Sequence, residues 1–178
     1  MSDVRSAGTA DTRPAERTRS DLLGIYLNDH LAGSTAGVRR AGHLAHTQRG
    51  NANGAVLRSI ADEIADDRET LLAIMRRLGV PARRYKVLAG GALELAGRLK
   101  SNGRIVRRSP LTTVLELELL RLGVEGKAAA WRTLRGVAES DHRLDPERLD
   151  RLIERAEQQI RTLEDLRMRQ AQRTFLAP

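Results

Sequence analysis

Two polar residues lie on apolar helical patterns in the first half of the chain, and both have side chains that bind metal ions. His30 belongs to the apolar stripe of a pattern over 20–48, and Asp67 replaces an apolar residue in a pattern over 54–78. Imidazole and carboxylate are ligands that suit iron and manganese in proteins. Because each residue shares a face with apolar neighbours, we expect both side chains to point inward.

Three glutamates extend this candidate site. Glu125 and Glu157 lie at nearly the same height as His30 and Asp67 when residues are counted along the helices. One hypothesis is therefore an atypical iron or manganese centre of His30, Asp67 and Glu125, completed by Glu63 or Glu157. The competing interpretation is that His30 and Asp67 form a buried hydrogen-bonded pair, since an unpaired buried polar group is costly.

Four long helices are expected to position these residues. Leu, Ala, Arg and Glu dominate the composition and aromatic residues make up 2%, which favours helices over strands. Periodicity and the breaks made by Gly, Asn and Pro predict helices over about 20–48, 54–78, 110–138 and 146–173. Residues 1–19 hold no apolar run and are predicted to be a disordered tail. The remainder, 20–173, has the size of a single domain.

The segment 79–109 is far longer than a hairpin between two helices needs. We expect it to be a helical crossover that carries the chain back along the bundle. Helices 54–78 and 110–138 are then parallel, while the first two helices and the last two form antiparallel pairs. The predicted fold is all-α: a four-helix bundle of two antiparallel pairs joined by a long crossover. Gly33 and Gly37 are interpreted as positions where helices pack closely.

This architecture resembles the ferritin-like superfamily across about residues 20–173. The segments LLGIYLNDHLAG and GRLKSNGRIVRRSPLTTVLELELLRLGVEGK are similar to those of an uncharacterised ferritin-like group in high-G+C bacteria. The superfamily builds a dimetal centre from one Glu on each of two helices and a Glu-x-x-His on each of the other two. Here that motif is missing from every predicted helix interior, because the one example, Glu139 to His142, falls at a helix end. The resemblance therefore implies the fold without its usual metal ligands.

Positive charge is concentrated in the predicted crossover. The formal net charge is +8, and the span 83–108 supplies most of it against Glu94 alone. We expect an anion-binding surface here, suited to nucleic-acid phosphates, anionic lipid or an acidic protein. The alternative is a solvated surface whose arginines cap helices or form ion pairs. The basic residues are Arg83, Arg84, Lys86, Arg98, Lys100, Arg104, Arg107 and Arg108.

The helix predicted over 110–138 is apolar on two sides, which is typical of a helix buried on two sides. One side is expected to face the bundle centre and the other to be covered by the crossover or by a second subunit, and the pattern does not say which is which. We expect the interaction face to be the stripe formed by Leu117, Leu120, Val124 and Trp131.

Several functional classes are excluded or disfavoured. Cysteine is absent, which excludes disulfides, thiolate metal sites and thiol catalysis. We find no nucleotide-binding glycine motif and no nucleophile elbow, and we assign no catalytic residue. With no transmembrane segment or signal peptide, the expected location is cytoplasmic. The sequence favours a non-catalytic structural or interaction protein without a cofactor. The alternative is a metal-binding oxidoreductase or metal-handling protein with iron or manganese, and the third hypothesis is a nonspecific nucleic-acid binder.

Overall fold

The computed structural model describes residues 13–83 and 109–176, with side chains from residue 20 onward in the first range. These residues form four helices: α1 (Arg13–Thr47), α2 (Gly54–Arg77), α4 (Pro110–Val137) and α5 (Pro146–Phe175). The described ranges hold no strand, which confirms an all-α bundle. Within them, no helix has both the length and the apolar composition needed to cross a lipid bilayer.

Local signals explain where the helices begin and end. The side chains of Ser109 and Asp145 each accept a backbone N–H from the first turn that follows, and a proline comes next in both cases. α2 ends at Arg77 and is followed by Gly79, whose φ of 71° places it in the left-handed region, and the N–H of Val80 donates to the carbonyl of Met75. α1 begins at Arg13, so it includes part of the segment 1–19 that we predicted to be a disordered tail.

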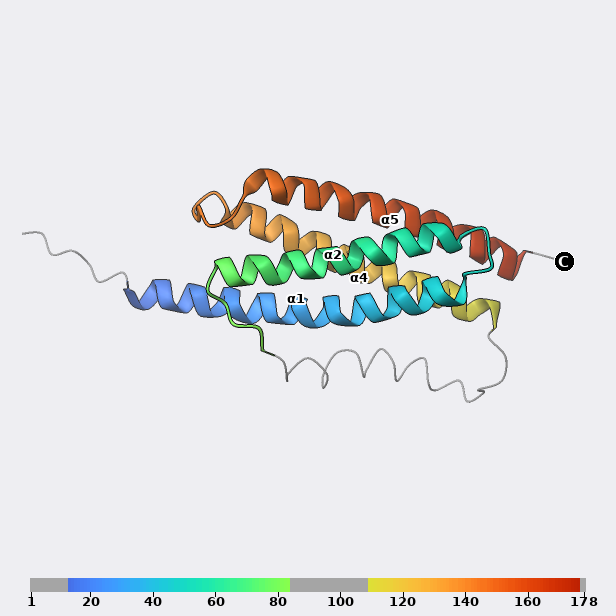
Figure 1. Ribbon diagram of the computed structural model, residues 1–178, viewed down its shortest axis with the longest axis horizontal. Helices are drawn as coiled ribbons and strands as arrows, with labels where there is room; N and C mark the ends of the chain where they lie inside the picture. Colours follow the sequence, from blue (N-terminus) through green and yellow to red (C-terminus); the bar gives the residue numbers. More distant parts are fainter. Residues whose placement is uncertain (1–12, 84–108, 177–178) are drawn as a thin grey trace, which may run out of the picture.

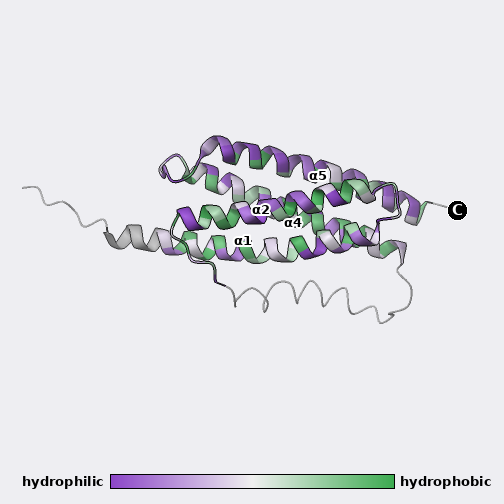
Figure 2. Cartoon of the chain, viewed as in Figure 1, coloured by the Kyte–Doolittle hydropathy of each residue, from purple (hydrophilic) through white to green (hydrophobic). Residues whose placement is uncertain are grey.

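The helices pack as two hairpins, which lie side by side in Figure 1. α1 contacts α2, α4 contacts α5, and α1 also contacts α4. Within each hairpin the two helices run in opposite directions, whereas α2 and α4 run in the same direction. The exposed face of α5 is mostly hydrophilic in Figure 2. Most of the predicted crossover lies outside the described residues, so the ferritin-like arrangement stays a prediction.

The predicted interaction face of α4 is wrong. Trp131 is 1% exposed, and the rest of that stripe is equally buried in the core. The physical reason is that α4 packs against both α1 and α5, so its apolar stripe is consumed within the chain. The buried stripe consists of Leu117, Leu120, Val124 and Trp131. The other apolar side of α4 is the one that reaches the surface, where Leu111 and Leu122 are exposed.

Candidate functional site

Asp67 is the centre of a buried polar network. It lies on α2 and its side chain is 2% exposed. Its Oδ2 pairs with the ammonium of Lys127 on α4, and its Oδ1 pairs with the guanidinium of Arg155 on α5. One carboxylate therefore links α2 to both helices of the second hairpin.

Two more side chains extend this network. Lys127 also donates to the amide oxygen of Gln159, and the Nε2 of Gln159 donates to Oε2 of Glu63 at 2.7 Å. We call Glu63, Asp67, Lys127, Arg155 and Gln159 the ion-pair cluster. Its two carboxylates and two cations cancel in formal charge. Buried charges persist in proteins when they are paired and hydrogen-bonded in this way.

Burial is the main influence on Lys127. Loss of water lowers the pKa of this lysine below its ordinary value, while the charge and hydrogen bond of Asp67 oppose the shift. The charge of Arg155 lowers the pKa further, and that of Glu63 raises it. The charged form of Lys127 therefore depends on the carboxylate beside it.

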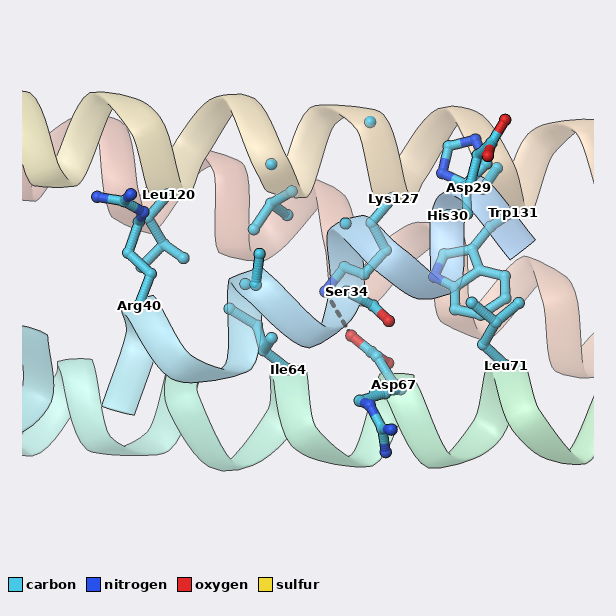
Figure 3. Close-up of a pocket in the computed structure, with 18 of the residues that line it drawn as sticks. Asp29, His30, Ser34, Arg40, Ile64, Asp67, Leu71, Leu120, Lys127 and Trp131 are labelled. Atoms are coloured by element: carbon cyan, nitrogen blue, oxygen red, sulfur yellow. Dashed lines mark hydrogen bonds and ion pairs between the residues drawn. The ribbon is translucent and has the colours of Figure 1, made fainter. Parts of the chain in front are cut away.

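A cavity of about 340 Å³ lies beside the cluster, between α1, α2 and α4. Figure 3 shows Asp67 and Lys127 on its wall with apolar side chains around them. The lining combines apolar, charged and glycine positions from the three helices. It includes Asp29, His30, Gly33, Ser34, Gly37, Arg40, Ile64, Asp67, Leu71, Leu120, Gly123, Gly126, Lys127 and Trp131.

Glycines leave much of this wall open. A Cβ atom built at Gly33, Gly123 or Gly126 would meet no other atom within 4 Å, and one at Gly37 would meet only Ile64 Cγ2 at 3.9 Å. The interpretation of Gly33 and Gly37 as close-packing positions is therefore wrong, because nothing approaches them closely. A glycine within a helix costs about 1 kcal/mol relative to alanine. The bundle thus carries a stability cost at positions where an alanine side chain would fit.

Trp131 places an unpaired donor beside the cavity. The side chain is 1% exposed, and its indole Nε1 has no hydrogen-bond partner among the described residues. In Figure 3 the indole nitrogen faces the part of the cavity where Ser34 and Lys127 lie. Buried donors in folded proteins are usually paired. An unpaired donor beside a cavity can pair with an acceptor on a molecule that enters the cavity.

His30 lines the same cavity from α1. Its ring stacks edge-on against Tyr26, with ring centroids 4.5 Å apart. Burial lowers the pKa of His30, and the charge of Asp29 opposes this shift. The imidazole is therefore neutral at neutral pH and can donate one hydrogen bond and accept one.

The structure does not bring the five proposed metal ligands together. His30 and Asp67 both line the cavity, but the oxygens of Asp67 pair with Lys127 and Arg155, so the expected pair with His30 is not formed. The remaining proposed ligands are also engaged: Glu63 with Gln159, Glu125 with Arg121 at 3.5 Å, and Glu157 with Arg132 at 2.7 Å.

No group of three His, Cys, Asp or Glu side chains in the part of the chain that the structure describes is placed to hold a metal ion. Two cations beside Asp67 would also repel a divalent ion at that carboxylate. The described residues therefore do not fit an iron or manganese centre, and that hypothesis gains no support from them.

Only the first residue of the predicted basic surface falls within the described ranges. Arg83 is exposed, and its backbone N–H donates to Asn28 Oδ1 at 2.7 Å. The other basic residues, over 84–108, lie outside the described residues. The anion-binding surface stays a prediction.

Sequence patterns did not predict a role for Lys127, Arg155 or Gln159. A signal for Gln159 was present, because it recurs with Ala156 and Leu163 at three- and four-residue steps on the buried stripe of α5. Lys127 gave a weaker signal: it follows Gly126 and precedes three alanines. Basic residues are usually exposed, which hides the rare buried ones.

Comparisons with protein-family models, with curated proteins and with solved structures found no match to this chain. The function is therefore argued from the geometry of the cavity and the ion-pair cluster.

Proposed function

We propose that this protein is a non-catalytic binding protein whose cavity takes up a small, mostly apolar molecule. The observation that carries the proposal is the cavity of about 340 Å³, held open at glycines inside two helices. An engineered apolar cavity of about 150 Å³ is enough to bind benzene. The volume here suits a molecule of two fused rings or a compact aliphatic one.

The walls support binding by a preformed site. Ile64, Leu71 and Leu120 supply apolar surface from two helices, and each is buried. The ion-pair cluster ties α2 to α4 and α5, so the wall that carries Asp67 and Lys127 is fixed before any molecule enters. Sites of this kind, apolar with a few placed polar groups, are typical of small-molecule binding.

The earlier structural hypotheses are compatible with this role and stay predictions. The parallel course of α2 and α4 in Figure 1 supports a crossover of the ferritin-like type. The predicted basic surface over 83–108 would bind an anionic partner. Self-association would use the side of α4 on which Leu111 and Leu122 are exposed.

The chain provides its own reporter for a test of binding. Trp131 is the single tryptophan of the sequence and lies on the cavity wall. We expect titration with indane, an uncharged bicyclic hydrocarbon, to change the tryptophan fluorescence in a saturable way at one molecule per chain. A linear, unsaturable response in the wild-type protein would contradict the proposal.

Glycine variants inside and outside the cavity lining show where indane binds. Gly37→Leu and Gly126→Leu place a side chain in the cavity and should weaken indane binding. Gly42→Leu and Gly136→Leu lie on the same two helices, outside the cavity lining, and like Gly126 these positions have no atom within 4 Å of a Cβ. They should bind indane as the wild type does, with circular dichroism confirming that every variant is folded. Equal affinity in all four variants would place the binding elsewhere.

A further inference from the structure

One side of the cavity is rich in hydrogen-bond donors. Lys127 and Trp131 are one helical turn apart on α4, so they share a face of that helix. The indole Nε1 of tryptophan is a donor only, and it is unpaired among the described residues. A protonated lysine has three donors, and Lys127 uses two of them, on Asp67 and Gln159.

Two of the acceptor groups beside these donors are already engaged. Each carboxylate oxygen of Asp67 pairs with a cation, and the amide oxygen of Gln159 receives Lys127. Ser34 donates its hydroxyl proton to the carbonyl of Leu31 at 2.8 Å, and its oxygen does not pair with Trp131. The cavity therefore has donors to spare at Lys127 and Trp131, and a bound molecule that supplies an acceptor can use them.

The charges around Lys127 and Trp131 favour an uncharged acceptor over an anion. The formal charges of the ion-pair cluster already cancel, so an anion placed between Lys127 and Trp131 would add an uncompensated buried charge. Two other cations line the cavity: Arg68 pairs with Glu69 at 2.6 Å, and Arg40 lies at the other end of the labelled wall in Figure 3, away from Trp131. An uncharged oxygen satisfies the donors at a lower cost of desolvation.

We propose that the cavity selects a small apolar molecule carrying one uncharged carbonyl oxygen, which accepts hydrogen bonds from the indole of Trp131 and the ammonium of Lys127. This inference rests on the proposed function and specifies the class of molecule that the same cavity takes. It makes Trp131 and Lys127 the residues that determine specificity, while the glycine and leucine walls provide room and apolar contact.

Neighbouring side chains cover the donor of Trp131: its Nε1 is buried and has no hydrogen-bond partner among the described residues. Contact with a bound oxygen therefore requires a small movement of the neighbouring side chains, which is common when a molecule binds. A bound molecule that supplies an acceptor gives this donor a hydrogen bond, whereas one without an acceptor leaves it unpaired.

Four probes with one skeleton test the inference, and one of them, indane carboxylate, carries an anion. Indane has no polar group, indanone has one carbonyl oxygen, and aminoindane has an ammonium that can only donate. We expect calorimetry on the full chain to give indanone an affinity at least about fivefold higher than indane, which corresponds to about 1 kcal/mol. Aminoindane should bind more weakly than indane, because its ammonium would face other donors.

The variant Trp131→Phe keeps an aromatic ring and removes the N–H. The preference for indanone over indane should fall towards one in this variant. If this variant does not fold, the affinities of the wild-type protein for the probes still test the inference. Equal affinity for indane and indanone, or tightest binding of aminoindane or of indane carboxylate, would overturn the inference and leave the proposed function standing. If no probe of the series binds, the proposed function fails with it.

Discussion

The substitution Asp67→Ala is the sharpest test of the ion-pair cluster. It removes the carboxylate that pairs with both Lys127 and Arg155. Removing one partner of a buried ion pair typically costs about 3–5 kcal/mol, because the other charge is left buried without compensation. The side chain of Arg155 is 34% exposed and can turn to water, whereas that of Lys127 is 13% exposed. We therefore expect a loss of about 3 kcal/mol, mostly from Lys127.

Urea unfolding followed by far-UV circular dichroism measures this loss. A chain of this size should also show a melting temperature lower by roughly 6–12 °C. Burial lowers the pKa of Lys127, and loss of Asp67 removes the main opposing influence. Between the lowered pKa and the ordinary lysine pKa the unfolded chain binds more protons, so stability rises with pH. The loss of stability caused by Asp67→Ala should therefore become smaller as the pH rises towards 10.5, the ordinary pKa of lysine.

The double variant Asp67→Ala, Lys127→Met shows whether the buried lysine causes the defect. Replacing both members of a buried pair with apolar groups is often close to neutral. We expect the second substitution to recover at least about half of the lost stability. The reasoning is refuted if Asp67→Ala costs less than about 1 kcal/mol, or if the double variant is less stable than Asp67→Ala alone.

Three further predictions follow from other contacts. Gly126→Ala and Gly136→Ala should each stabilise the fold by about 0.5–1 kcal/mol in urea unfolding, since a Cβ at either site meets nothing within 4 Å; a loss at Gly126 alone would show that the cavity wall is closed there. Burial lowers the pKa of His30, so stability should fall as the pH drops below 6.5, because the unfolded chain then takes up a proton that the folded chain does not. In the variant His30→Gln, stability should depend less on pH in this range. An unchanged pH dependence would show that His30 does not cause the fall in stability. Asp145→Ala should cost about 1 kcal/mol, because the carboxylate accepts the N–H of Arg148 at 3.0 Å; Asp145→Asn, which keeps an acceptor, should lose less.

The positions of the helices could be predicted because the signals are local. A cap and a proline mark the starts of α4 and α5 within a few residues, and Gly79 marks the end of α2 by a backbone angle that glycine adopts easily. α1 is the exception, since it begins before the first apolar repeat. Periodicity reports where a helix packs and not how far it extends beyond the packed part.

The site was predicted only in part, because its contacts join distant residues. Periodicity correctly placed Asp67 inside the bundle, but it carries no information about partners on other helices. Lys127 and Arg155 are cations, and cations are expected on the surface unless a buried carboxylate is known to face them. The cavity depends on the separation of α1 from α4, which no pattern within a single helix records.

The distribution of charge in the ion-pair cluster affects how the two hairpins pair during folding. Both carboxylates, Glu63 and Asp67, come from the α1–α2 hairpin, and both cations, Lys127 and Arg155, come from the α4–α5 hairpin. If two copies of the same hairpin paired during folding, like charges would meet in a core without water. Correct pairing brings opposite charges together instead. The cluster therefore discriminates against misassembled chains, so its contribution to folding specificity can exceed its contribution to stability.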